Sequence, residues 1–372
     1  MTTTEHPVDL PFPGLTGVPT TEETLTGKDF TSDQEVRWCP GCGDYAVLKA
    51  VQGFLPSLGL RRENIVFISG IGCSSRFPYY LNTYGMHSIH GRAPAIATGL
   101  ATAREDLSVW VVTGDGDALS IGGNHLIHAM RRNVNLKILL FNNRIYGLTK
   151  GQYSPTSEPG KITKSTPLGS VDHPFNPVSL ALGAEASFVA RTIDSDRKHL
   201  TEVLATAAAH RGTALVEIYQ NCPIFNDGAF DALKQQRHED DDTGAVIPLR
   251  HGEPIRFGTP AQDGPHQGLG TKGVVRDPQS GGVKVVQIDD TNADDVLVHD
   301  AKNPDPTTAF ALSRLTDAGV LHQSPIGIFR NIDRPTYDDQ ARAQVNTARE
   351  GQGDPQAALA GLISGADTWT VV

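Results

Sequence analysis

The feature that most constrains this chain is an apolar strand that leads directly into a glycine turn and then a helix. Residues 108–113 (SVWVVT) precede GDGD at 114–117, and the next residues, ALSIGGNHLIHAMRRN, have the pattern of a helix. A second apolar run follows at residues 136–142 (LKILLFN). In such a parallel unit the turn places backbone N–H groups and a positive helix end at the carboxyl edge of the sheet. We therefore expect a diphosphate to bind at this edge.

Further apolar runs extend the pattern along the chain. Residues 64–69 (NIVFIS) and 214–219 (ALVEIY) read as buried strands, and a helix is expected over 196–210, after the capping candidates Asp194 and Ser195. Continuous apolar strands separated by helices predict an α/β fold with a doubly wound parallel sheet, covered by helices on both faces.

The chain is longer than this core needs. Residues 1–37 are rich in Thr, Pro and Glu without a sustained period, so we expect an N-terminal arm, extended or disordered. The core is expected over residues 38–231. After it the composition shifts to HEDDDTG and to Gly, Pro and Asp, with short strand-like pieces such as residues 284–288 (KVVQI). We interpret residues 232–372 as a C-terminal extension that wraps the core or a partner.

The charge balance excludes several classes of partner. With 32 Lys and Arg against 42 Asp and Glu, the net charge is −10, which repels nucleic acid and anionic membranes. We find neither a run long enough for a transmembrane span nor a basic and apolar leader, so we expect a cytoplasmic protein.

Oxygen ligands follow two neighbouring strands. Asp115 and Asn143 are separated by 27 residues, a spacing that brings them side by side at one edge of the sheet. Mg²⁺ prefers such ligands together with water and phosphate oxygens. The alternative is an Asp helix cap and an Asn turn. The GDG and NN spacing resembles the magnesium-diphosphate signature of thiamine diphosphate enzymes, which also uses the carbonyl two residues after the Asn, here that of Ile145.

The four cysteines are spaced Cys39-x2-Cys42-x30-Cys73-x148-Cys222, and without a secretory leader structural disulfides are not expected. Glycine and proline beside the thiols suit an iron-sulfur cluster with four cysteine ligands. Structural zinc is the main alternative, although it usually pairs two C-x-x-C knuckles. A redox pair at Cys39 and Cys42 would leave the other two unexplained. Spacing alone does not decide between the cluster and zinc.

Several long motifs together resemble one family. They are WCPGCGDYAVLKA, GIGCSSRFPYYLNTYGMHSIHGRAPAIATGLA, GDGDALSIGGNHLIHAMRRNVNLKILLFNNRIYGLTKGQYSPT and NCPIFND, within residues 38–231. The family is the β subunit of 2-oxoacid:ferredoxin oxidoreductases, with the 2-oxoglutarate enzyme as the nearest member, and it implies a sheet of the thiamine-diphosphate-binding type. The residues implied to bind one 4Fe-4S cluster are Cys39, Cys42, Cys73 and Cys222. Those implied to hold Mg²⁺ are Asp115, Asn143 and the Ile145 carbonyl. Those implied to line thiamine diphosphate are Gly72, Cys73, Ser74, His90, Gly116 and Asp117.

The resemblance also implies an activity and partners. The reaction is oxidative decarboxylation of 2-oxoglutarate with coenzyme A to succinyl-CoA and CO₂. All four cysteines are used, so electrons leave the cluster through a separate acceptor, ferredoxin. No Glu lies in these motifs, and in this family the glutamate that activates the cofactor comes from the α subunit. The chain is therefore expected to be inactive alone and to form an obligate complex, α₂β₂.

Three residues are candidates for the substrate pocket. Lys150, in GLTKGQ, is placed to meet the 1-carboxylate or the cofactor, and Leu148 to shape the pocket; a solvated loop lysine is the alternative. Arg76 is the candidate for the distal carboxylate, because guanidinium binds carboxylate bidentately. Its alternative role is packing or a salt bridge.

The histidines are assigned lesser roles. A second metal at His87 and His90 is not expected, and His90 with Arg92 is expected to face the phosphates or the partner. His125 and His128 fall among apolar positions of the helix after GDGD and are interpreted as structural.

Three other functions stay open at this point. The first is the same chemistry on pyruvate or on branched-chain or aryl 2-oxoacids. The second is a non-oxidative thiamine-dependent decarboxylase or carboligase. The third is a zinc-stabilised subunit without catalytic activity.

Overall fold

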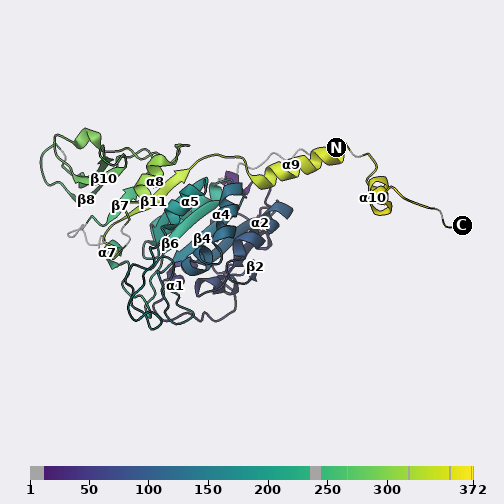
Figure 1. Cartoon of the computed structure of the whole chain (residues 1–372), viewed down its shortest axis with the longest axis horizontal. Helices are drawn as coiled ribbons and strands as arrows, with labels where there is room; N and C mark the ends of the chain where they lie inside the picture. Colours follow the sequence, from purple (N-terminus) through teal and green to yellow (C-terminus); the bar gives the residue numbers. More distant parts are fainter. Residues whose placement is uncertain are drawn as a thin grey trace.

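The computed structural model describes residues 12–234, 244–265, 267–316, 319–351, 353–369 and 371, and is built around one large sheet (Figure 1). Within these residues eight strands follow the order β2-β1-β3-β4-β6-β5-β11-β7. Their bounds are β1 Ile65–Ser69, β2 Tyr84–His87, β3 Ser108–Gly114, β4 Lys137–Asn142, β5 Phe188–Ile193, β6 Ala214–Tyr219, β7 Val246–Leu249 and β11 Ser324–Asn331. The first six strands in this order, β2-β1-β3-β4-β6-β5, are parallel to one another. The strand β11 pairs antiparallel with β5 and parallel with β7. The predicted doubly wound fold is confirmed.

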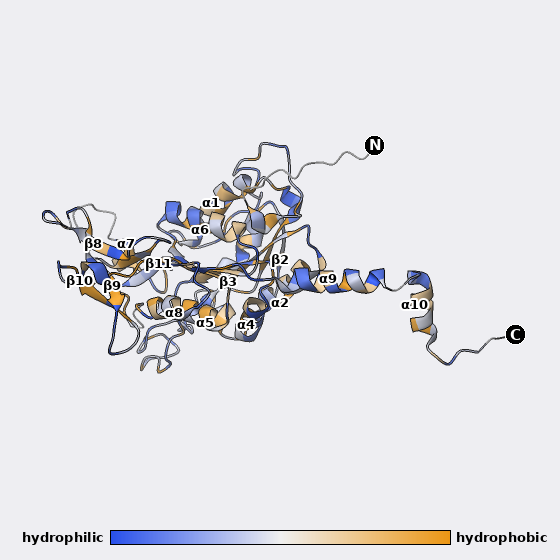
Figure 2. Cartoon of the chain, turned by 90° about the horizontal axis from the view of Figure 1, so that it is seen from above, coloured by the Kyte–Doolittle hydropathy of each residue, from blue (hydrophilic) through white to orange (hydrophobic). Residues whose placement is uncertain are grey.

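Helices cover both faces of the sheet (Figure 2). Their bounds are α1 Asp44–Phe54 and α6 Arg197–Ala209 on one face, and α2 Ala93–Ala103, α4 Gly123–Arg132, α5 Pro177–Gly183 and α8 Thr307–Ser313 on the other. Successive strand residues face opposite sides, so Phe67 and Trp110 pack with α1 and α6, while Val66 and Val109 pack with α2 and α4. Burial on both faces explains why these strands are continuously apolar.

The predicted helix over 196–210 is confirmed, but its cap is not the predicted one. Asp196 is the N-cap of α6, and its side chain accepts a hydrogen bond from the His199 backbone N–H at 3.1 Å. Asp194 instead accepts a hydrogen bond from the Asn221 backbone N–H at 2.8 Å. It therefore joins the ends of β5 and β6 rather than starting the helix.

The described part of the expected N-terminal arm, residues 12–37, packs against the core. Phe12, Leu15, Val18 and Phe30 are buried in the apolar cluster that includes α1 and α6. Residues 1–11 of that arm lie outside the described residues, as do residues 238–243 of the HEDDDTG segment.

The C-terminal part contributes to the sheet and also extends beyond it. It supplies β7 and β11, a small antiparallel sheet of β8 Arg256–Pro260, β9 Gly270–Arg276 and β10 Val283–Gln287, and the helices α9 Tyr337–Glu350 and α10 Pro355–Ser364. The start of α9 is fixed to the core because Arg211 pairs with Asp339 at 2.8 Å. Figure 2 shows α10 away from the core and largely apolar. None of its residues is buried, and Leu362 is 82% exposed.

Among the described helices, none is long and apolar enough to cross a membrane.

Candidate cofactor site

The loops that follow β1, β3 and β4 converge on one cavity of about 620 Å³ at the carboxyl edge of the sheet. Ligands bind at this edge in open α/β folds. The sequence-predicted residues that line it are Gly72, Cys73, Ser74, His90, Asp115, Gly116, Asp117, Asn143, Ile145 and Leu148. The structure thus brings together every residue that the resemblance implies for Mg²⁺ and for the lining of thiamine diphosphate.

Asp115 is the first residue of α3 (Asp115–Leu119) and is almost completely buried. Its Oδ2 accepts hydrogen bonds from Ser154 Oγ at 2.5 Å and Thr156 Oγ1 at 2.6 Å. Burial raises the pKa of this carboxyl to about 6, although the two hydroxyls oppose the shift. A cation beside the carboxylate would favour the ionised form.

Asn143 and Ile145 form a tight turn directly after β4. Asn143 Oδ1 accepts a hydrogen bond from the Ile145 backbone N–H at 3.2 Å, and its Nδ2 donates to Gln220 Oε1 at 3.0 Å. Arg144, between them, has a left-handed backbone with φ of 57°. A carboxylate, an amide oxygen and a backbone carbonyl beside one cavity are the kind of oxygen donors that suits Mg²⁺.

Asp117 lines the cavity, but both oxygens of its carboxylate accept hydrogen bonds from neighbouring segments of the chain. Oδ1 accepts from the backbone N–H groups of Ile71 at 3.2 Å and Gly91 at 2.7 Å, and Oδ2 accepts from Thr113 Oγ1 at 2.6 Å. The side chain therefore holds the loops after β1 and β2 against the GDG turn.

Two positions in the cavity wall require glycine, each for a different structural reason. A Cβ on Gly116 would lie 2.1 Å from the ring of Tyr146, whose hydroxyl donates to the Gly116 carbonyl at 3.2 Å. Gly72 has φ of 139°, a conformation that other residues rarely adopt. Both sites therefore favour glycine.

Sequence reasoning missed part of the cavity wall and its support. Tyr146, Ser120 and Gln152 line the cavity, while Ser154 and Thr156 lie behind Asp115. Ser154 and Thr156 belong to the GQYSPT sequence, which is part of the family motif, but no role was assigned to their hydroxyls from the sequence. No periodicity marks this loop, so only the motif could have indicated them.

The four cysteines converge beside this cavity and form no disulfide. A Cβ on Gly147 would lie 3.5 Å from Cys73 Sγ and 3.8 Å from Cys222 Sγ. Burial raises the pKa of Cys73 to about 12, with further contributions from Asp44, Cys222 and Cys39. Burial also raises the pKa of Cys42, and Cys73 and Cys222 add to it. Cys222 therefore lies close enough to Cys42 and to Cys73 to disfavour ionisation of those two thiols.

This environment bears on the alternatives for the cysteines. A redox pair at Cys39 and Cys42 would still leave Cys73 and Cys222, which lie near Cys42, without a role. In the described part of the chain, no group of three or more His, Cys, Asp or Glu side chains is arranged to hold a metal ion, so the geometry favours neither zinc nor an iron-sulfur cluster. Four thiols are the donor set of a 4Fe-4S cluster.

Two of the candidate substrate residues lie outside the cofactor cavity. Lys150 is exposed, has φ of 77°, and lines a separate hollow of about 460 Å³ with Lys164 and Phe225. Arg76 is half-buried, and its Nε donates to the Tyr80 hydroxyl at 3.1 Å. Of the three candidates, only Leu148 lines the cavity.

Of the histidines considered from the sequence, one lines the cavity and the others do not. His90 is exposed at the cavity wall, and His87 Nδ1 lies 2.8 Å from the Ser75 carbonyl. His125 is half-buried and His128 is exposed on α4, and neither lines the cavity. Arg92 hydrogen bonds to the Ile121 carbonyl at 3.3 Å rather than to another side chain.

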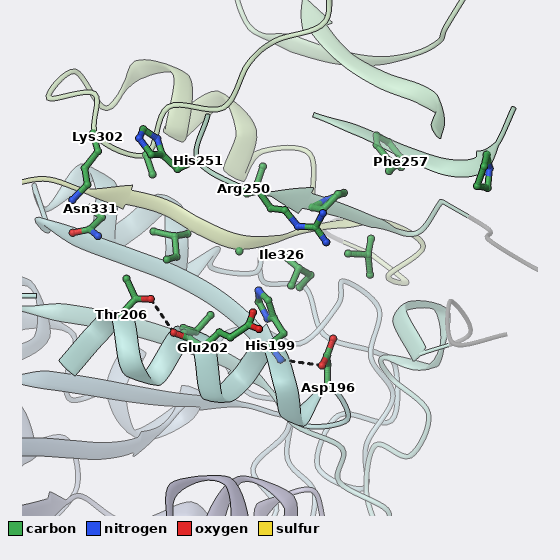
Figure 3. A pocket seen from close by; sticks show the side chains of 18 residues that line it. Asp196, His199, Glu202, Thr206, Arg250, His251, Phe257, Lys302, Ile326 and Asn331 are labelled. Atoms are coloured by element: carbon green, nitrogen blue, oxygen red, sulfur yellow. Dashed lines mark hydrogen bonds between the residues drawn. The ribbon is translucent and has the colours of Figure 1, made fainter. Parts of the chain in front are cut away.

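A larger cavity, of about 930 Å³, lies elsewhere, between α6 and the strands β7 and β11 (Figure 3). Figure 3 shows His199 and Glu202 of α6 on one side and Arg250, His251 and Lys302 opposite. None of the sequence-predicted site residues lines it. The cavity at the GDG turn is therefore the candidate cofactor site.

The sheet and the oxygen donors at its carboxyl edge define a class, the thiamine diphosphate-binding domains. Residues 70–218 match the family of thiamine pyrophosphate enzymes, C-terminal TPP binding domain. The cysteines beside the cavity point to an oxidoreductase within this class.

Comparison with individual proteins narrows the class. The chain is 68% identical over 363 residues to 2-oxoglutarate oxidoreductase subunit KorB of Mycobacterium tuberculosis, covering 96% of this chain and 93% of that protein. It is 45% identical over 192 residues to the 2-oxoacid:ferredoxin oxidoreductase β subunit of Sulfolobus, covering 51% of this chain and 63% of that protein.

A solved structure gives the same result. The 2-oxoglutarate:ferredoxin oxidoreductase from Magnetococcus marinus, with 2-oxoglutarate, coenzyme A and succinyl-CoA bound, matches with a TM-score of 0.71 and 32% identity over 94% of this chain and all of that chain. The chain belongs to the family of 2-oxoacid:ferredoxin oxidoreductase β subunits, in the 2-oxoglutarate (KorB) group. The resemblance found in the sequence is confirmed.

Proposed function

We propose that this chain is the β subunit of a 2-oxoglutarate:ferredoxin oxidoreductase, which forms succinyl-CoA and CO₂ from 2-oxoglutarate and coenzyme A. One observation supports this most strongly. Cys73 belongs to the group of converging thiols and also lines the cavity of the GDG turn. A redox centre on the cysteines and a cofactor in the cavity would therefore share a wall, which suits electron transfer over a short path.

In this proposal the cavity holds thiamine diphosphate and Mg²⁺. Asp115, Asn143 and the Ile145 carbonyl hold the cation, and Gly72, Ser74, His90 and the GDG turn line the cofactor. When bound, thiamine diphosphate supplies the carbanion chemistry that decarboxylation of a 2-oxoacid requires. The chain itself contributes orientation: Asp117 fixes the loops around the cavity, and Gly116 lets Tyr146 pack closely against the turn.

The electrons are proposed to pass through one 4Fe-4S cluster on Cys39, Cys42, Cys73 and Cys222. Cys39 is exposed whereas Cys222 is buried, so the cluster would reach from the cavity wall toward the surface. Ferredoxin is the proposed acceptor.

A partner subunit completes the site in this proposal. Among the described residues that line the cavity there is no Glu. The α subunit is proposed to supply the glutamate that activates the cofactor, within an α₂β₂ complex in the cytoplasm. The C-terminal extension, and α10 above all, is proposed to pack on that subunit, because its apolar side chains are exposed on this chain.

The substrate contacts are proposed from charge and position. Lys150, two residues after the cavity residue Leu148, would meet the 1-carboxylate of 2-oxoglutarate. Arg76 would bind the distal carboxylate, and it lies close enough to Cys73 to affect the pKa of that thiol. Both side chains would have to turn toward the cavity when the substrate and the α subunit are bound.

The test is anaerobic reduction of a low-potential dye by this chain co-expressed with its α partner. We expect reduction that requires coenzyme A and that is faster with 2-oxoglutarate than with pyruvate. Preference for pyruvate would overturn the assignment of 2-oxoglutarate as the substrate but would leave the proposed reaction type unchanged. A complex that contains iron, sulfide, Mg²⁺ and thiamine diphosphate, yet reduces no dye with any 2-oxoacid, would overturn the proposal.

A further inference from the structure

The carboxylate of Asp115 is held on one side by two hydroxyls from a distant loop. Ser154 Oγ and Thr156 Oγ1 both donate to the same oxygen, Oδ2, at 2.5 and 2.6 Å. Within the described residues these are the side chains that hydrogen bond to this carboxylate. All three side chains are nearly completely buried, with exposures of 2 to 3%.

We propose that Ser154 and Thr156 are positioning residues for the divalent cation, because they hold Asp115 Oδ2 and so present Oδ1 as the ligand. This inference rests on the proposed function. An ionised carboxylate has about four lone-pair sites on its two oxygens, and the two hydroxyls occupy those of Oδ2. The backbone N–H groups of Gly116 and Asp115 also act on the carboxylate and still leave room for a metal. Hydroxyls are suited to this task because they fix the carboxylate without cancelling the charge that attracts the cation.

The loop that carries these hydroxyls is itself hydrogen-bonded to the turn after β4. Ser154 N–H donates to Ser157 Oγ at 2.8 Å, and Ser157 Oγ donates to the Arg144 carbonyl at 2.6 Å. The loop is thus tied to the turn that bears Asn143 and Ile145. Asp115 and the turn with Asn143 and Ile145, which are proposed to supply the cation ligands, are therefore both hydrogen-bonded to residues 154–157.

Thr156 also lies beside a series of buried polar side chains in the sheet. Its hydroxyl oxygen lies 2.9 Å from Asn142 Oδ1, and Asn142 Nδ2 donates to Glu217 Oε1 at 2.7 Å. Glu217 Oε2 in turn accepts from Arg191 Nε at 2.7 Å. Because Thr156 donates its one hydroxyl proton to Asp115, the hydrogen-bonded series that ends at the buried ion pair between β5 and β6 begins at Asn142, against which the Thr156 hydroxyl packs.

The test measures cation affinity in the α/β complex stripped of metal with a chelator. Mg²⁺ is titrated in the presence of excess thiamine diphosphate, and binding is followed by circular dichroism of the cofactor; Mn²⁺ binding is counted by electron paramagnetic resonance. Thr156→Val and Ser154→Ala remove one hydroxyl each, Thr156→Ser retains it, and Ser165→Ala alters an exposed serine of the same loop. Loss of such supporting contacts weakens metal binding about 10- to 100-fold in other sites.

We expect Thr156→Val and Ser154→Ala to weaken Mg²⁺ and Mn²⁺ binding by about 10-fold or more. Thr156→Ser and Ser165→Ala should bind as the wild type does. Unchanged affinity in both Thr156→Val and Ser154→Ala would overturn the inference, as would equal loss in Thr156→Ser. A wild-type complex that binds no cation with thiamine diphosphate would instead contradict the proposed function.

Discussion

At the scale of single residues, the side chains proposed to hold the cation owe their positions to the strands that they follow. Asp115 and Asn143 lie at the carboxyl ends of β3 and β4, where parallel pairing fixes their proximity. Arg76 and Lys150 were chosen for their charge, and charge does not specify direction: Arg76 contacts Tyr80, and Lys150 lines another hollow. Thr156 was missed because its role depends on a loop without periodicity.

The close packing of Gly116 gives a prediction at this scale. Gly116→Ala would place a methyl group against the ring of Tyr146, and forced packing of this kind costs ~1–3 kcal/mol. We expect a lower midpoint of thermal unfolding and weaker binding of thiamine diphosphate. Gly123→Ala is the control, because a Cβ there has open space at the start of α4. Equal behaviour of the two variants would contradict the proposed packing.

At the scale of elements, the parallel strands β1, β3, β4 and β6 and the helix α6 were predicted, whereas β2, β5 and the sheet edge beyond β5 were not. The apolar runs of β1, β3, β4 and β6 are long and continuous, so their burial shows in the sequence. β11 pairs antiparallel with β5 from more than a hundred residues away. Such non-local pairing leaves little local signal. The predicted caps of α6, Asp194 and Ser195, were one or two residues early because three consecutive residues, from Asp194 to Asp196, can each cap a helix.

The ion pair between β5 and β6 gives a prediction at the element scale. Arg191 and Glu217 are 1% and 0% exposed and lie 2.7 Å apart. Removing one partner of a buried pair costs ~3–5 kcal/mol, because the other charge is left buried and uncompensated. We expect Arg191→Met to lower the free energy of unfolding by about that amount in denaturant titrations, and Arg191→Met with Glu217→Met to cost less than the single change.

The matched control is a solvent-exposed ion pair with the same separation. Arg104 and Asp106 also pair at 2.7 Å, but their side chains are 56% and 36% exposed. Solvent screening limits such a pair to ~0–1 kcal/mol, so Arg104→Met should leave stability nearly unchanged. If both arginine variants lose the same stability, burial is not the reason for the cost.

At the scale of the whole molecule, the C-terminal extension has two different parts. β7 and β11 belong to the central sheet, so a deletion after Gly244 would remove sheet strands and test folding rather than assembly. α10 has no buried residue on this chain, which makes it the part that a partner can cover. The composition of the extension suggested a partner contact but could not separate these parts.

Truncation after Glu350 tests the role proposed for this end. We expect the shortened chain to keep its unfolding midpoint, because the deleted helix α10 has no buried residues, and to bind the α subunit more weakly in sedimentation and titration experiments. Leu362→Ser with Ile363→Ser is the matched full-length variant, since both side chains are strongly exposed. A complex that forms equally well in both cases would exclude α10 as a contact with the α subunit.

The central claim is that substrate oxidation in the cavity reduces a centre on the four cysteines. The most direct measurement is anaerobic electron paramagnetic resonance of the α/β complex, recorded before and after addition of 2-oxoglutarate and coenzyme A. The account predicts a reduced iron-sulfur signal that appears with 2-oxoglutarate and is lost in Cys222→Ser. An iron-containing complex whose spectrum is unchanged by 2-oxoglutarate and coenzyme A would contradict it.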